Sequence, residues 1–167
     1  DFESVGSGNL GPVPGTPFNL STQGFTFSSS AAFSIENPPS STVPNHSGNV
    51  LVDSGAGSDS IQMASTDGST FSLVNLVAGP GLKNRPFAPN PFNAQVLNLT
   101  GTISGGGIVS TSFNLAGGYT TFDLPAGWDN LTAIHFYGSG APSGGNSIAL
   151  DDIFVSLNQT NLARLNE

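Results

Sequence analysis

Two groups of carboxylates stand near opposite ends of the chain, in Asp1-Phe2-Glu3 and in the apolar run that contains Asp151 and Asp152. A carboxylate inside an apolar strand costs free energy unless it is paired or bound to a cation. Hard cations such as Ca²⁺ take about six to eight oxygen ligands from carboxylates and carbonyl groups. Because the first and last strands of a sandwich often lie side by side, we expect the two groups to share one ion.

Strand geometry limits how the two adjacent aspartates can act. Consecutive residues face opposite ways, so Asp151 and Asp152 can share a site only if a bulge turns one of them. Otherwise one of them faces water or caps a backbone group. The alternative to a cation is that these carboxylates are solvated and discourage edge-to-edge strand pairing. The segment Asp53–Asp59 also carries two carboxylates, but it lacks the further ligands of a calcium loop, which favours a hairpin turn.

Exposed aromatic rings are the second group with binding chemistry, because a ring can stack on the face of a sugar. The chain has 12 Phe but only 2 Tyr and 1 Trp, and Phe-rich usage is typical of a core. Trp128 stands in an expected turn, so we predict it as a ligand-binding residue, together with Tyr119 and Tyr137. The alternative is that the Trp128 ring folds over the end of the sandwich.

Residues able to catalyse a reaction are few. His46 lies in a Pro/Asn/Ser loop and His135 in an apolar strand, while the nucleophile-elbow and His-Glu-x-x-His motifs are both missing. Glu36, Asp53 and Asp123 could supply two carboxylates for glycoside hydrolysis, but nothing in the sequence places them across a cleft. The sequence therefore predicts a protein that is not an enzyme.

Asn-x-Ser/Thr sequons are present, although the abundance of Asn, Ser and Thr makes several expected by chance. They permit glycosylation in a secretory pathway. The predicted sites are Asn19, Asn45, Asn98, Asn130 and Asn158.

Composition limits the partners. The chain has 11 acidic and 3 basic residues, giving a formal net charge of −8. It therefore lacks the basic patches with which proteins bind nucleic acid or anionic membranes. No apolar run approaches the roughly 20 residues of a membrane span, so we expect no membrane insertion. Cysteine is absent, which excludes disulfides and thiolate sites. The neutral Ser, Thr, Gly and Asn content is typical of a secreted protein, with Asp1 beginning a mature or trimmed form.

The elements that position these residues are short strands. Apolar and polar residues alternate, and Gly, Pro, Ser and Asn separate the runs, while no window shows helical periodicity. We expect an all-β, two-sheet antiparallel β-sandwich of the jelly-roll type, with about ten strands over residues 1–157. Residues 158–167 form a polar tail or linker, and Ala78–Phe92 is the longest expected loop. The expected strands are Gly24–Phe27 paired as a hairpin with Ala32–Ile35, then Asn49–Val52, Ser60–Met63, Thr70–Leu76, Gln95–Gly101, Gly107–Leu115, Tyr119–Leu124, Leu131–Tyr137 and Ser147–Leu157.

The acidic motif at the start and the run Ile148–Ile153 resemble the ends of MAM domains and, more loosely, of jelly-roll carbohydrate-binding modules. The runs Tyr119–Pro125 and Leu131–Phe136 are similar to those of secreted bacterial and fungal domains of uncharacterised function. MAM domains carry disulfides, so the resemblance is to a cysteine-free variant.

In the resembled families a cation, usually calcium, often lies between equivalent acidic residues and has a structural role. The resemblance therefore implies Glu3 and Asp152 as calcium ligands. Asp1 and Asp151 are further contributors.

Two functions follow as expectations. The first is a non-catalytic extracellular binding or adhesion module for a carbohydrate, with calcium joining the terminal strands. The second is a structural subunit of an extracellular fibre or surface coat, which pairs with neighbouring copies of itself through strand edges or the tail.

Overall fold

The alternating apolar and polar runs form β-strands joined by tight turns. The computed structural model describes residues 2, 18–29, 33–36, 50–53, 60–81, 93–115 and 118–157, and within these ranges it has eleven strands and no helix. The strands are β1 (Phe18–Thr22), β2 (Phe25–Ser29), β3 (Phe33–Glu36), β4 (Val50–Asp53), β5 (Ile61–Ser65), β6 (Phe71–Pro80), β7 (Val96–Ile103), β8 (Ile108–Asn114), β9 (Thr120–Asp123), β10 (Leu131–Ser139) and β11 (Ile148–Leu157).

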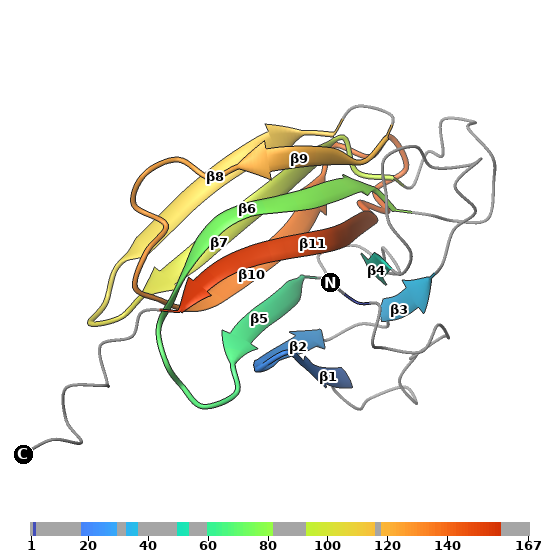
Figure 1. The fold of residues 1–167 in the computed structure, drawn as a ribbon. Coiled ribbons are helices and arrows are strands. Elements are labelled where there is room, and N and C mark those ends of the chain that lie inside the picture. The colour runs from blue at the N-terminus through green and yellow to red at the C-terminus, as the bar shows by residue number, and fades with distance from the viewer. Residues whose placement is uncertain are drawn as a thin grey trace, which may run out of the picture.

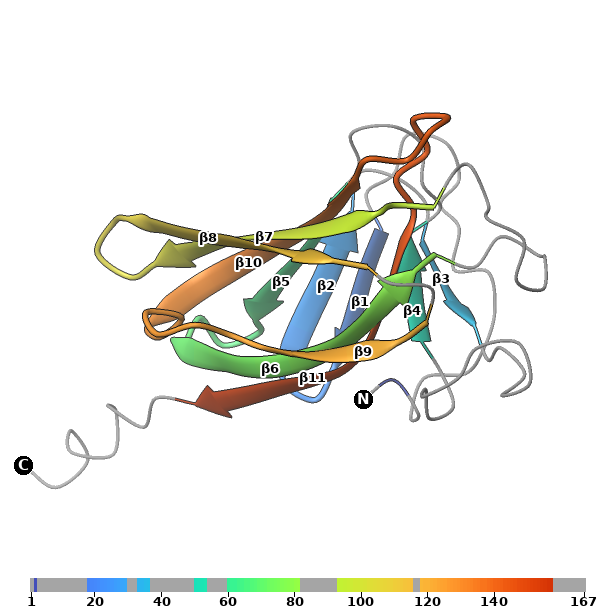
Figure 2. The same ribbon diagram turned by 90° about the horizontal axis from the view of Figure 1, so that it is seen from above.

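The strands form two layers with antiparallel pairing throughout. One layer, in front in Figure 1, has the order β3-β4-β11-β6-β9, and the back layer has the order β1-β2-β5-β10-β7-β8. Figure 2 shows the two layers from above. A single pair of residues, Leu131 and Phe71, links β10 of the back layer to β6 of the front layer. The predicted all-β, two-layer antiparallel sandwich is confirmed.

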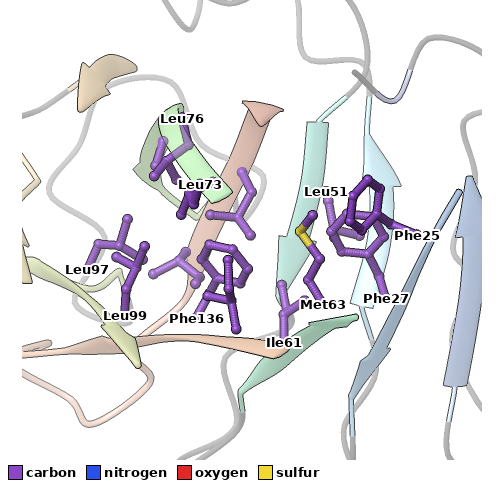
Figure 3. Packing of buried hydrophobic residues seen from close by; sticks show 14 of the residues in the cluster. Phe25, Phe27, Leu51, Ile61, Met63, Leu73, Leu76, Leu97, Leu99 and Phe136 are labelled. Carbon is purple, nitrogen blue, oxygen red and sulfur yellow. The ribbon is translucent and has the colours of Figure 1, made fainter. Parts of the chain in front are cut away.

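The core lies between the layers, because every second residue of each central strand points inward. Phe27 and Met63 from the back layer lie beside Leu51 from the front layer, while Leu73 of the front layer lies across from Phe136 of the back layer (Figure 3). The rings of Phe25 and Phe71 meet edge to face with centroids 5.1 Å apart. Each such buried side chain contributes about 1.5–3 kcal/mol to the free energy of unfolding.

Three details of the predicted strands are wrong. β2 and β3 do not form a hairpin: β2 pairs with β1 and β5 in the back layer, whereas β3 pairs with β4 in the front layer. Alternation shows which face of a strand is buried but does not show its partner. β1 was not predicted, and Ala78–Pro80 continue β6 instead of opening the long loop.

No helix in the described part of the chain is long and apolar enough to cross a membrane.

Candidate functional site

The outward side chains of the back layer form one polar surface, which we call the polar face. Its orientation follows from alternation: Leu97 and Leu99 of β7 and Phe136 of β10 are buried between the layers, so the residues between them point outward. The strand register aligns one outward residue from each strand. This central row is Asn19, Ser28, Gln62, His135, Thr100 and Ser110.

Two further rows flank the central one. One is Ser21, Thr26, Ala64, Ala133, Thr102 and the exposed Ile108 on β8, and the other is Tyr137, Asn98 and Ser112. None of these residues is Asp, Glu, Lys or Arg. The polar face therefore presents mainly hydroxyl, amide and imidazole groups over six neighbouring strands.

Tyr137 is the aromatic side chain of the polar face, and it is 39% exposed. Asn98 lies directly across from it on β7. The Asn98 Nδ2 donates to Ser139 Oγ at 2.9 Å and to the Tyr137 carbonyl oxygen at 3.3 Å, which fixes the amide beside the ring. The Asn98 Oδ1 is left to accept a hydrogen bond from a ligand.

Hydroxyl groups continue the polar face toward β8. The Ser110 hydroxyl donates to Thr100 Oγ1 at 3.5 Å. His135 lies between Gln62 and Thr100 in the central row, half-buried. An aromatic ring on this face can stack on the flat side of a hydroxylated ligand, while the neighbouring donors and acceptors form hydrogen bonds with the ligand's edges.

The other two predicted aromatic residues lie in the interior. Trp128 is 3% exposed and belongs to the core, with its ring beside Gly101. Its Nε1 has no hydrogen-bond partner within the described ranges. Tyr119 lies over Gly79 on the outer side of the front layer and is also buried. Neither ring offers a face to solvent, so Tyr137 alone keeps the exposed ring that a platform needs.

The acidic run of β11 contains an irregularity. The pairing of β11 with β6 shifts register between Asp151 and Phe154, and Asp152 has a φ of 33°. Asp151 is 0% exposed, and its Oδ1 accepts a hydrogen bond from the Asp152 backbone N–H at 2.9 Å. Asp152 is half-buried. A bulge thus turns the chain at the two aspartates.

The N-terminal acidic residues Asp1 and Glu3 lie outside the described residues. Phe2, between them in the sequence, is buried, and its ring meets Phe27 edge to face at 5.3 Å. The expected pairing of first and last strands is wrong for the described strands. β1 pairs with β2 at the edge of the back layer, whereas β11 lies between β4 and β6 in the front layer.

The sequons occupy different surroundings. Asn19 and Asn98 lie on the polar face, the first exposed and the second half-buried. Asn130 is exposed in the turn before β10, with a φ of 51°. Asn45 and Asn158 lie outside the described residues.

The remaining candidates are scattered. His46 and the turn within Asp53–Asp59 lie outside the described residues, as do Lys83 and Arg85 of the long loop. Asp123 is exposed on β9. Within the described ranges, no three His, Asp or Glu side chains come together as a metal site.

The sequence predicts Tyr137 as a ligand-binding residue but gives no such signal for its neighbours. In the sequence, Asn98 stands out only as a sequon and His135 only as a histidine in an apolar strand, while Gln62 and Thr100 belong to no motif. Period-two alternation could have placed each of them on an outward face. It could not show that β5, β10 and β7 are neighbours, since these strands are far apart in sequence.

Comparison with known proteins gives no family. No family model matches the chain, and no curated protein matches it.

Solved structures with a similar outline include TmCBM61 in complex with β-1,4-galactotriose, at 12% identity and a TM-score of 0.46 over 81% of this chain and 90% of that one. A second is the GH31 CBM32-2 module bound to GalNAc, at 12% identity and a TM-score of 0.44 over 74% and 95% of the two chains. A third is the family 11 carbohydrate-binding module from Clostridium thermocellum in complex with a β-1,3-1,4-mixed-linked tetrasaccharide, at 11% identity and a TM-score of 0.41 over 84% and 94%.

Proposed function

We propose that this protein is a secreted, non-catalytic module that binds a neutral glycan on the polar face. The observation that carries the proposal is the exposed ring of Tyr137, fixed beside the Asn98 amide on a hydroxyl-rich surface without Asp, Glu, Lys or Arg. Sugar rings present apolar C–H faces and hydroxyl edges, so an aromatic ring with hydrogen-bonding neighbours suits both.

The charge of the face decides between classes of glycan. Apart from His135, the described residues of the polar face include no basic side chain that could neutralise a carboxylate or sulfate, and the chain has a formal net charge of −8. Anionic glycans are therefore disfavoured. The expected ligand is a neutral polysaccharide, and adhesion to such a polymer is the corresponding biological role.

Tyr137→Ala tests this function. Loss of the stacking ring should weaken binding to neutral polysaccharides by about tenfold or more, since a well-placed aromatic contact contributes roughly 1–1.5 kcal/mol. Binding is measured by affinity electrophoresis across soluble neutral polysaccharides, then by calorimetry on those that retard the protein. Tyr137→Phe keeps the ring and should keep most of the affinity.

Phe154→Ala is the matched control, because Phe154 is an aromatic residue, 56% exposed, on the outer side of the front layer. It should bind like the unaltered protein. Equal losses in the Tyr137→Ala and Phe154→Ala proteins, or no binding to any neutral polysaccharide, would contradict the proposal.

We also propose a structural calcium ion at the Asp151–Asp152 bulge, with Asp1 and Glu3 as ligands from the start of the chain. Support comes from the oxygen chemistry of these side chains, from the full burial of Asp151 and from the anchoring of Phe2 in the core. When bound, the ion supplies positive charge to the buried Asp151 carboxylate and joins the start of the chain to β11.

A further inference from the structure

β8 forms an open edge of the back layer. In the described ranges its pairing partner is β7. Leu115 N–H donates to the Gln95 carbonyl at 2.8 Å, and Ile103 N–H donates to the Gly107 carbonyl at 3.0 Å. Hydrogen-bonded and non-hydrogen-bonded pairs alternate in an antiparallel ladder, so the odd-numbered residues of β8 bond to β7. The even-numbered residues direct their N–H and C=O groups outward from the edge: Ile108, Ser110, Ser112 and Asn114.

This edge lacks the usual protection against pairing. Natural edge strands are blunted by charged side chains, proline, bulges or short length. β8 has seven residues with no charge and no proline, and its register with β7 is regular from end to end. Ile108 is 74% exposed. The edge of the front layer beside it, β9, is shorter and ends in Asp123.

The residues of β8 complement each other across a two-fold axis. We propose that two copies of this chain pair through β8, antiparallel, with the axis at Thr111. In this register Ser110 of each copy faces Ser112 of the other, and the outward N–H and C=O groups of both strands are matched in hydrogen-bonded pairs.

The same register also matches apolar side chains on the core side of β8. Val109 of each copy faces Phe113 of the other in a non-hydrogen-bonded pair, where side chains approach most closely. Both residues are half-buried against the core, and Phe113 stacks on Phe122 with centroids 4.7 Å apart. Pairing therefore covers the exposed parts of the Val109 and Phe113 side chains. Since β8 carries no ionisable group, two negatively charged molecules meet there without burying charge.

Pairing through β8 makes the two polar faces continuous, with six strands from each copy in one layer. The two Tyr137 rings would then be separated by five strand spacings, or ~24 Å. This consequence rests on the proposed glycan function and predicts that a long polysaccharide chain binds more tightly than a short oligosaccharide. The dimer itself does not depend on it.

Sedimentation of the full chain without glycan, over a wide range of protein concentration, tests the dimer. The expected result is a reversible equilibrium between monomer and dimer. Ser110→Pro should abolish the dimer, because it removes an outward N–H while leaving every β7–β8 hydrogen bond in place. Ser110→Ala keeps that N–H and should keep the dimer.

A series of charged variants tests the register of the dimer. It also tests the dimer independently of whether the Ser110→Pro protein folds. The Ser110→Lys/Ser112→Lys protein places like charges opposite each other and should be monomeric, whereas Ser110→Lys/Ser112→Glu places opposite charges together and should dimerise. A monomer at all concentrations, a dimer indifferent to these changes, or open-ended filaments would overturn the proposal. Dimerisation without glycan binding would instead refute the proposed function and leave the interface standing.

Discussion

At the scale of single residues, burial decides which candidate side chains can act. Tyr137 and Trp128 are both aromatic residues near strand ends, yet one is exposed on the polar face and the other lies in the core. The difference follows from the direction in which each backbone position points. Side-chain hydrogen bonds act at the same scale, and Asp67 in the turn between β5 and β6 is the clearest example.

Hydrogen bonds to the ionised carboxylate lower the pKa of Asp67 from 3.8 to about 2, chiefly the one from the Ser65 hydroxyl at 2.6 Å and also that from Ser69. Because the folded-state pKa is depressed, this stabilisation is fully present above pH 3.8 and is lost as the pH falls toward 2. Carboxyl NMR titration should show a midpoint near 2 for the unaltered protein. Ser65→Ala should move that midpoint upward.

Thr66→Val is the control for this titration, since the Thr66 hydroxyl donates to the Gly24 carbonyl rather than to Asp67. It should leave the Asp67 midpoint unchanged. A midpoint at 3.8 in the unaltered protein would show that the turn does not form in solution.

At the scale of elements, alternation gives the two faces of each strand different roles: one face packs in the core and the other is available for binding. In β10, Phe136 is buried between the layers, while its neighbour Tyr137 is on the polar face. Each strand of the back layer contributes to the core and to the candidate site in this way. The two roles can be separated by mutating adjacent residues.

Phe136→Ala should lower the free energy of unfolding by about 3–5 kcal/mol, because it removes a buried ring and leaves a cavity. Tyr137→Ala should change it by no more than about 0.5 kcal/mol, as expected for a surface substitution. Urea unfolding followed by circular dichroism measures both values. Similar losses in the two variants would mean that the faces of β10 are assigned the wrong way round.

At the scale of the whole molecule, the two layers have different roles. The back layer carries the polar face and the open edge at β8, while the front layer carries the β11 bulge and the exposed Phe154. The calcium ion proposed at the bulge would connect the beginning of the chain to the front layer. It therefore affects global stability rather than glycan recognition.

Calcium should raise the midpoint of thermal unfolding of chelator-treated protein by about 5 °C or more at saturating concentrations, because the ion binds the folded state alone. Asp152→Asn should remove most of this shift. Asp123→Asn, which changes an exposed aspartate on β9, should retain it. An unchanged midpoint on adding calcium to the unaltered protein would exclude the site.

The sequence by itself determined the strand character of the chain and the burial of residues such as Phe25, Phe27 and Ile35, because alternation and turn residues are local signals. It also determined that no extensive basic patch can form, since the chain has only 3 Lys and Arg residues. Only the tertiary structure decided that β2 and β3 lie in different layers and that Tyr137 stands beside Asn98. These facts depend on pairings between distant segments, which register and packing fix only when the whole sandwich forms.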